Sequence, residues 1–215
     1  VDIDLAAARR TQERIGAAGG EALALACDVA RGDSVQAAIE AVRARWGGLQ
    51  VLVNNAALTQ KPARISRTPE ADLDRLLAVN IKSLYHMAVH ALPLMREGGG
   101  GNVINIASVT AIRPRPGMTW YNATKAAVSM LSRQLRVDAF GKRVRVTEIC
   151  PGRVATDIFA HVHGDSKETY ERFIEGFELP VAEDIANAAF YLVSNAGRYV
   201  TGVTLPVDAG YVNKR

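Results

Sequence analysis

The chain has 215 residues, of which 48% are hydrophobic, and this is enough for one domain with a sizeable core. Its formal net charge of +4 comes from scattered lysines and arginines, without a dense basic run or interleaved aromatics, so nucleic acid is not an expected partner. No apolar run approaches the roughly 20 residues that cross a bilayer, so no membrane association is expected either.

Strand and helix patterns alternate along the whole chain, with no repeat and no linker. The predicted strands are the tail Val1–Asp4, then Ala22–Val29, Leu49–Ala57, Val103–Ala107, Arg143–Ile149 and Val203–Val207. The predicted helices are Leu5–Ala18, Ser34–Trp46, Pro69 to about Met95, Trp120–Phe140 and Ala182–Ser194, with a helix-prone stretch at Thr156–Phe177. Repeated βα units predict an α/β fold with a doubly wound parallel sheet, the Rossmann fold, with helices on both faces.

The long helix after Pro69 has acidic residues in its first turn and is expected to stop at the glycines Gly98–Gly101. Pro93 near its end either kinks this helix or marks its last turn. A polar loop at Thr110–Thr119 then leads into the helix that carries Tyr121.

A glycine-rich phosphate loop is missing from the sequence. In doubly wound dinucleotide-binding folds the first strand lies at the centre of the sheet, and this loop follows it. The sequence has no G-x-G-x-x-G-like segment between a strand and a helix, and Gly98–Gly101 precedes a strand instead. We therefore expect the single domain 1–215 to lack its first βα unit, by truncation or by omission, which would leave a gap in the middle of the sheet.

Cysteines and histidines give no sign of a metal site. Cys27 and Cys150 lie far apart in apolar segments, and two buried thiols in a reducing cytoplasm are the expected state, so we predict a cytoplasmic protein. His86 and His90 share a helical face, and the pair 161/163 alternates, but no carboxylate or thiol completes a ligand set. No metal is expected.

Tyr121 and Lys125 form the sharpest chemical signal in the chain. They stand four residues apart, so on a helix the phenol and the ammonium lie on one face. A phenol keeps its proton until about pH 10, but a nearby positive charge favours the phenolate. Ser108, at the end of an apolar strand, could hold a carbonyl oxygen beside them. This pattern predicts a ketone/alcohol redox site; a solvated amphipathic pair, with Ser108 capping the strand, is the alternative.

With these motifs the chain resembles the short-chain dehydrogenase/reductase family, and the resemblance covers nearly all of it. Asn54-Asn55-Ala56-Ala57 resembles the family's Asn-Asn-Ala-Gly element, with Ala57 in place of the glycine. The other matching elements, in chain order, are Val79-Asn80-Ile81, Ser108, Tyr121-x-x-x-Lys125, Pro151-Gly152 with Val154 and Thr156, Ile185-Ala186 and Val207–Gly210. Within the family the chain looks most like 3-oxoacyl reductases and polyol dehydrogenases.

The resemblance implies a role for each matching residue. Tyr121 would act as general acid in reduction and as general base in oxidation, and Lys125 would lower its pKa and bind the nicotinamide ribose. Ser108 would orient the substrate oxygen, and Asn80 would hold a water that passes protons to Lys125. Asn80 satisfying backbone groups at a helix kink is the alternative.

The resemblance also implies residues that bind the nucleotide. Pro151-Gly152 with Thr156 matches the loop that contacts the nicotinamide carboxamide, and Asp28 and Val29 resemble the pair that borders the adenine. The other cofactor-binding residues expected are Asn54, Ala56, Val154, Tyr121 and Lys125. An acidic residue at the end of the second strand accepts hydrogen bonds from the ribose hydroxyls and repels a 2′-phosphate. Asp2 is best placed for this, with Asp4 as the fallback, so NAD(H) is preferred and NADP(H) remains possible.

The substrate is expected to be a small alcohol or ketone, which the sequence does not identify further. Arg113 and Arg115 either attract an anionic substrate or are surface charge. The segment Ala160–Leu179 should cover the pocket, with Phe159, Phe173 and Phe177 lining it or packed inward. The resemblance implies a homo-oligomer, dimer or tetramer, built through helices Glu70–Met95 and Trp120–Phe140. The missing glycine loop leaves a catalytically silent nucleotide-binding or scaffold protein as the alternative function.

Overall fold

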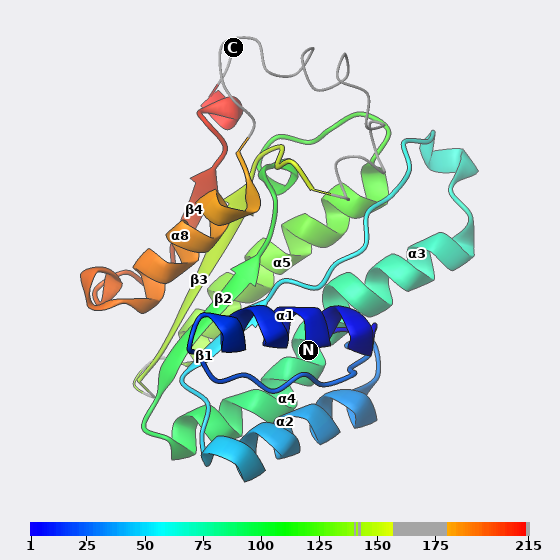
Figure 1. Cartoon of the computed structure of the whole chain (residues 1–215). Coiled ribbons are helices and arrows are strands. Elements are labelled where there is room, and N and C mark those ends of the chain that lie inside the picture. Colours follow the sequence, from blue (N-terminus) through cyan, green and yellow to red (C-terminus); the bar gives the residue numbers. More distant parts are fainter. Residues whose placement is uncertain (140, 142, 157–179, 214–215) are drawn as a thin grey trace.

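The computed structural model describes residues 1–139, 141, 143–156 and 180–213. Its centre is a parallel four-stranded sheet in the order β1-β2-β3-β4 (Figure 1). The strands are β1 (Val51–Asn54), β2 (Gly101–Ile106), β3 (Val144–Pro151) and β4 (Thr204–Val207). Because all four run the same way, their carboxyl ends lie at one edge of the sheet.

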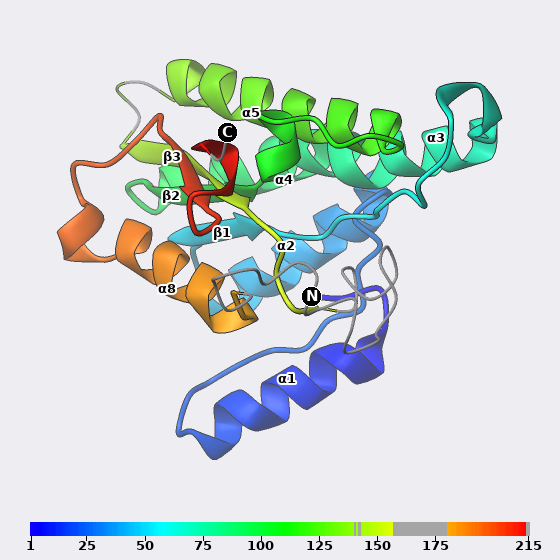
Figure 2. The same ribbon diagram turned by 90° about the horizontal axis from the view of Figure 1, so that it is seen from above.

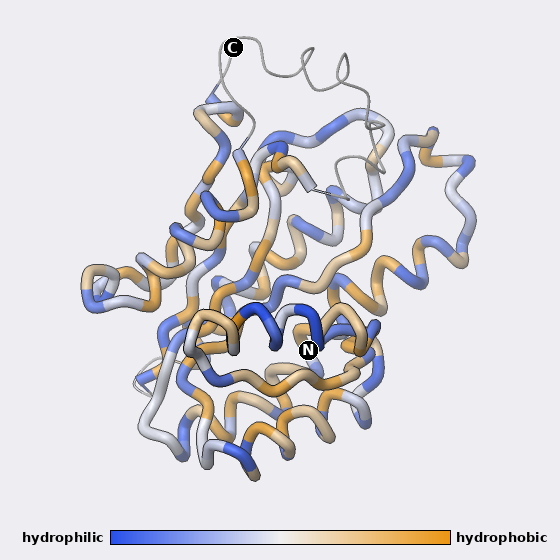
Figure 3. The backbone as a smooth tube through the Cα atoms, in the orientation of Figure 1, coloured by the Kyte–Doolittle hydropathy of each residue, from blue (hydrophilic) through white to orange (hydrophobic). Residues whose placement is uncertain are grey.

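Helices cover both faces of this sheet, which confirms the predicted Rossmann-type fold. Figure 2 shows α4 (Ser83–Glu97) and α5 (Thr119–Asp138) on one face and α8 (Ala182–Val193) on the other. The remaining helices are α1 (Leu5–Ala17), α2 (Gly32–Trp46) and α3 (Glu70–Leu77). In Figure 3 the middle of α1 is hydrophilic and its ends are more apolar, and its buried residue is Ala8, which agrees with its peripheral position.

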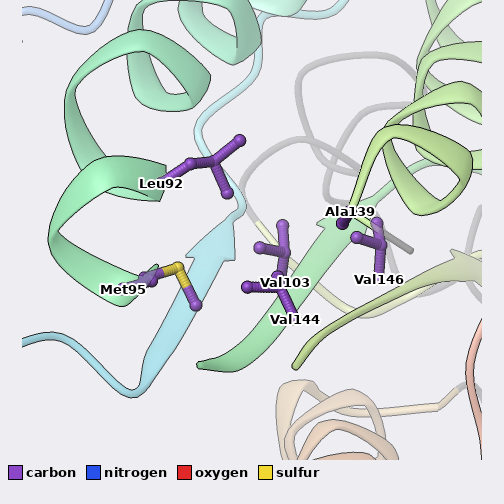
Figure 4. Close-up of a cluster of buried hydrophobic side chains, with 6 residues drawn as sticks. All are labelled: Leu92, Met95, Val103, Ala139, Val144 and Val146. Atoms are coloured by element: carbon purple, nitrogen blue, oxygen red, sulfur yellow. The ribbon is translucent and has the colours of Figure 1, made fainter. Parts of the chain in front are cut away.

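The core explains why apolar residues on the central strands face both sides of the sheet. Along β2, Val103 packs toward α4 and α5, and the next residue, Ile104, packs toward α8. One cluster between the sheet and the first helix pair is shown in Figure 4 and comprises Leu92, Met95, Val103, Ala139, Val144 and Val146. A strand buried on both faces therefore needs no polar alternation.

The outer edge of β1 has no partner strand within the described residues. The predicted strand Ala22–Val29 is wrong, because this segment forms only an isolated parallel bridge between Asp2 and Ala26. A strand needs a continuous hydrogen-bonded neighbour, and only the short tail at Asp2 provides one here. Val51 and Val53 on β1 are 39% and 46% exposed, as expected for apolar residues on an uncovered strand.

The long helix predicted after Pro69 is interrupted. α3 ends at Leu77, a π-helical turn spans Ala78–Lys82, and α4 then continues to Glu97. Pro93 lies inside α4 without ending it, because Pro93 is on the exposed side where water can satisfy the backbone carbonyl that loses its partner. The interruption falls at Asn80 instead, and π-turns often mark functional sites.

Exposed apolar side chains gather on α4 and α5, the two helices through which we expect a homo-oligomer to form. They include Tyr85, Val89, Met130 and Val137. Oligomer formation stays a prediction. The helix-prone stretch after Thr156 and the pocket-covering segment Ala160–Leu179, with its three phenylalanines, lie outside the described residues.

Candidate active site

The predicted catalytic residues meet at the carboxyl edge of the sheet. Ser108 follows β2 by two residues, and α5, which carries Tyr121 and Lys125, packs along β2 and β3. In open α/β sheets this edge is where ligands bind. The structure therefore brings together the three residues that the sequence analysis grouped.

The side chains of Ser108 and Tyr121 lie near each other. The Ser108 hydroxyl favours the ionised form of the phenol and so opposes the rise in its pKa. The Ser108 Oγ also accepts bonds from the Thr110 backbone N at 3.2 Å and the Thr110 Oγ1 at 3.0 Å. A hydroxyl has two lone pairs and one proton, so these two bonds leave the Ser108 proton available for a further acceptor. Ser108 thus caps the turn after β2, as the alternative interpretation proposed, and also contacts the phenol.

Lys125 is buried one helical turn beyond Tyr121. It is 4% exposed, and its Nζ donates to the Ile106 carbonyl oxygen at 2.8 Å. This bond fixes the ammonium at the end of β2, at 5.9 Å from the centre of the Tyr121 ring. Burial lowers the pKa of Lys125 to about 8, because the charged form loses its hydration.

The expected effect of Lys125 on the phenol is wrong for this structure. The pKa of Tyr121 is raised, chiefly by burial, which disfavours the phenolate. The Ser108 hydroxyl opposes this shift but is outweighed by burial. The Lys125 ammonium is bound to the Ile106 carbonyl oxygen, and its charge does not offset the cost of burying a phenolate. Tyr121 therefore holds its proton firmly.

Asn80 is buried in the π-helical turn and fastens the segment after β1. Its Oδ1 accepts from the Leu58 backbone N at 2.8 Å, and its Nδ2 donates to the Leu58 carbonyl oxygen and to the Thr124 Oγ1, both at 3.0 Å. These contacts agree with the interpretation in which Asn80 satisfies backbone groups. Its side chain already has protein partners, so the predicted water-holding role does not follow from the amide.

The residues at the end of β1 face in different directions, Asn54 toward the protein interior and Ala56 toward solvent. The Asn54 Nδ2 donates to the Asn105 Oδ1 at 2.8 Å, and the Asn105 Nδ2 donates to the Ser132 Oγ at 2.8 Å. Asn54 thus begins a polar chain that runs inward beneath α5. Ala56, two residues later, is exposed at the carboxyl edge. Of this element, the backbone near Ala56 is the part open to a ligand.

Asp2 and Asp4 have different local roles. The Asp4 side chain caps α1 by accepting from the Ala6 backbone N at 2.9 Å. The Asp2 Oδ1 accepts from the Asp4 backbone N at 2.9 Å, and Asp2 is exposed at the end of its short paired segment. The capping role of Asp4 leaves Asp2 as the better candidate for the adenosine ribose. Asp28 is partly buried, and its carboxylate accepts from the Ala30 backbone N at 3.0 Å; Val29 next to it is also partly buried.

The turn after β3 is fixed by close packing. A Cβ on Gly152 would lie 2.9 Å from the Cα of Asp208, so only glycine fits there. The Gly152 backbone N also donates to the Val207 carbonyl oxygen at 2.9 Å. Val154 is partly buried, and the exposed Thr156 donates to the Val154 carbonyl oxygen at 3.3 Å. Pro151 and Gly152 thus reach the same edge as Ser108.

Gln60 was missed by the sequence analysis although it contacts the helix that carries Tyr121. It is 5% exposed, and its Oε1 accepts from the backbone N of Trp120 at 3.0 Å and of Tyr121 at 3.2 Å. Gln60 belongs to no motif and lies far from Tyr121 in the chain, so the sequence held no signal for it. Cys150, also buried, lies beside Ser108, and burial raises its pKa to about 12.

Three arginines lie around Tyr211. Arg113 and Arg115 belong to the loop after β2, and Arg153 belongs to the turn after β3. The guanidinium carbons of Arg113 and Arg153 lie 5.1 and 4.8 Å from the centre of the Tyr211 ring, and the Arg113 Nη1 donates to the Tyr211 carbonyl oxygen at 2.9 Å. Burial lowers the pKa of Arg115, and the nearby charge of Arg153 lowers it further. Positive charge is therefore concentrated beside the carboxyl edge.

The described residues contain neither a candidate metal site nor a helix that could span a membrane. Among residues 1–139, 141, 143–156 and 180–213, no group of three or more histidine, cysteine, aspartate or glutamate side chains could hold a metal ion. The helices described there are also too short or too polar to cross a membrane.

The sequence is similar to a known protein family and to known dehydrogenases and reductases. A family described as "Enoyl-(Acyl carrier protein) reductase" matches residues 1–212. The chain is 36% identical over 196 residues to a 4-formylbenzenesulfonate dehydrogenase of Comamonas testosteroni, covering 89% of this chain and 78% of that protein. It is 31% identical over 183 residues to a 3-oxoacyl-[acyl-carrier-protein] reductase of Chlamydia trachomatis, covering 85% of this chain and 73% of that protein.

A solved structure has the same fold. The 3-ketoacyl-(acyl-carrier-protein) reductase from Brucella melitensis, complexed with NADH, matches with a TM-score of 0.88 and 32% identity, covering 97% of this chain and 85% of that one.

Proposed function

The chain belongs to the short-chain dehydrogenase/reductase family, and on that premise we propose that it transfers a hydride between nicotinamide and a secondary alcohol or ketone, with Tyr121 as general acid or base. The observation that carries this proposal is the placement of Tyr121 one helical turn from the buried Lys125 and near the Ser108 hydroxyl, at the carboxyl edge of the sheet. Such a constellation suits proton transfer at a carbonyl oxygen.

The residues of the site divide the chemistry between them. In reduction, Tyr121 donates its proton to the carbonyl oxygen of the substrate, and its raised pKa keeps that proton available at neutral pH. Ser108 turns its hydroxyl proton toward the same oxygen and holds it in place. In oxidation Tyr121 has to lose its proton first, so we expect oxidation to gain from alkaline pH. A bound nicotinamide supplies the hydride donor or acceptor.

The donor and acceptor groups present suit a nicotinamide nucleotide. Lys125 offers an ammonium beside Tyr121, Asp2 offers an exposed carboxylate, and Pro151-Gly152 offers backbone groups at the carboxyl edge. Full-length protein should therefore turn over ketones with a reduced nicotinamide in a substrate screen. Binding of the nucleotide without turnover of any ketone or alcohol would favour the silent nucleotide-binding alternative.

We propose NAD(H) as the preferred cofactor, on the basis of Asp2. An exposed carboxylate at this place would accept bonds from the ribose hydroxyls and repel a 2′-phosphate. Asp2→Ala should therefore raise kcat/KM with NADPH by about 10-fold or more relative to NADH. The substitution removes the repulsion between the carboxylate and the 2′-phosphate, and such a like-charge contact costs up to several kcal/mol of binding free energy. The ratio of kcat/KM for the two cofactors measures it.

Asp4→Ala is the matched control for Asp2. It removes a carboxylate two residues away that caps α1, so it should lower stability by about 1 kcal/mol and leave the cofactor ratio unchanged. A wild-type protein that already prefers NADPH would contradict the assignment of Asp2.

We further propose that the substrate carries an anionic group. Three arginines converge around Tyr211 beside the carboxyl edge, and one similar protein is named for a sulfonated aldehyde. Guanidinium groups bind carboxylate, sulfonate or phosphate through charge-assisted hydrogen bonds. Arg115→Met should then lower kcat/KM about 10- to 100-fold for a carboxylated or sulfonated ketone, and little for its neutral analogue.

Arg133→Met is the control, because Arg133 is exposed on α5 away from this group. Equal losses on charged and neutral substrates, or equal effects of the two variants, would show that the arginines around Tyr211 do not select an anion.

A further inference from the structure

Helix α5 begins without a cap of its own. Its N-cap residue is Met118, whose side chain makes no capping hydrogen bond. The first backbone N–H groups of a helix have no partner within the helix, and a side-chain oxygen at the N-cap usually accepts from the second or third of them. In α5 these are the N–H groups of Trp120 and Tyr121. A thioether cannot replace that oxygen.

Gln60 provides the missing oxygen from a distant part of the chain. Its Oε1 accepts from both Trp120 N at 3.0 Å and Tyr121 N at 3.2 Å. Two converging N–H donors require an acceptor, so the amide can stand only with its oxygen toward the helix. The Nε2 then donates to the Thr68 Oγ1 at 3.2 Å, which holds this orientation. A buried amide with both ends bound this way is a rigid contact.

The segment around Gln60 is itself fastened on either side. Asn80 binds both backbone groups of Leu58, and the Ala63 backbone N donates to the Gly117 carbonyl oxygen at 2.9 Å. Gln60 lies between these two attachments. On the N-terminal side of Gln60, the loop after β1 is bound to the π-helical turn through Leu58. On the C-terminal side, it is bound to the loop that precedes α5 through Ala63. A firm support of this kind can set where the first turn of α5 lies.

We infer that Gln60 is a positioning residue for the phenol of Tyr121. Tyr121 is the third residue of α5, so fraying of the first turn moves it directly. Lys125 lies a turn deeper and has its own bond to Ile106. Loss of the Gln60 oxygen thus separates Tyr121 from Ser108 while Lys125 stays in place. This role rests on the proposed function, because the phenol matters only if it transfers a proton.

Gln60→Met tests the inference in the full-length protein. Methionine keeps the length and most of the volume of the side chain but removes the oxygen. We expect kcat to fall about 10- to 100-fold, because small misplacements of a reacting group have effects of this size. The dissociation constant for the nucleotide should stay within about 2-fold of wild type, since Lys125 is undisturbed.

Two further variants separate positioning from a general loss of structure. Gln60→Glu keeps an acceptor oxygen and should recover most of kcat. Thr68→Val removes only the partner of the amide nitrogen and should leave kcat within about 2-fold of wild type. If Gln60→Met fails to fold, the inference is judged on these two variants, and a Gln60→Glu protein that is folded but no faster than Tyr121→Phe overturns it.

A wrong assignment of Gln60 can be distinguished from a wrong proposed function by comparing two variants. If Tyr121→Phe is inactive while folded Gln60→Met turns over at the wild-type rate, Gln60 does not position the phenol and the proposed function stands. If Tyr121→Phe keeps wild-type turnover, the proposed function is wrong and the role of Gln60 falls with it.

Discussion

Tyr121→Phe should lower kcat about 1,000-fold, within the range that general acid–base groups contribute. The substitution removes one oxygen and keeps the ring that packs at the start of α5. Hydride transfer to a ketone then leaves an alkoxide without the phenol proton that would neutralise it. Steady-state kinetics with saturating nucleotide measure the loss, and fluorescence titration of NADH should give a dissociation constant close to wild type.

Tyr85→Phe is the matched control for this change. Tyr85 is an exposed tyrosine on α4, so removing its hydroxyl should leave both kcat and nucleotide affinity unaltered. A Tyr121→Phe enzyme as fast as the Tyr85→Phe enzyme would contradict the role of the phenol.

Lys125→Met should cause the second largest loss of kcat. The pH dependence of its free energy of unfolding tests the burial of Lys125 independently of activity. We expect kcat to fall about 100-fold or more, because the proposed contact of the ammonium with the nicotinamide ribose is lost and the reacting groups are misplaced. The buried charge also costs stability, since the pKa of Lys125 is about 8 in the folded chain and 10.5 as its ordinary value. Between these two pH values the unfolded chain binds more protons, so the free energy of unfolding rises with pH.

The rise should amount to at most about 3 kcal/mol in wild type and be absent from Lys125→Met. Chemical denaturation from about pH 8, the folded pKa of Lys125, to about pH 10, where the phenol begins to titrate in the unfolded chain, measures most of this rise. Above this window the raised pKa of Tyr121 acts in the opposite direction, because the unfolded chain loses the phenol proton first and stability falls.

Lys82→Met provides the control, because Lys82 is an exposed lysine at the π-helical turn. It should keep the wild-type slope of stability against pH. The same slope in Lys125→Met would mean that Lys125 is solvated and not buried beside Ile106.

The grouping of Tyr121, Lys125 and Ser108 could be predicted from the sequence, because spacing along a helix and the end of a strand can be recognised from neighbouring residues alone. Four residues between Tyr121 and Lys125 place them on one face of α5, and a polar residue just after an apolar strand places Ser108 at the carboxyl edge. Parallel βα units bring that edge and that helix together. These steps need no knowledge of packing.

What the sequence did not predict depends on burial and on distant contacts. The direction of the Tyr121 pKa came out wrong because spacing gives the nearness of Lys125 but not the loss of water around the phenol. The strand Ala22–Val29 came out wrong because a pairing partner cannot be seen in one segment alone. Gln60 was missed because its contact with α5 joins segments far apart in the chain.

Single-turnover kinetics test the central claim most directly. Full-length protein loaded with reduced nicotinamide is mixed with a ketone substrate from the screen, and the loss of nicotinamide absorbance is followed in wild type and Tyr121→Phe. We predict a rapid decay in wild type and almost none in the variant at equal nucleotide occupancy. Equal decay rates would mean that the proton comes from elsewhere and that Tyr121 is not the acid of this site.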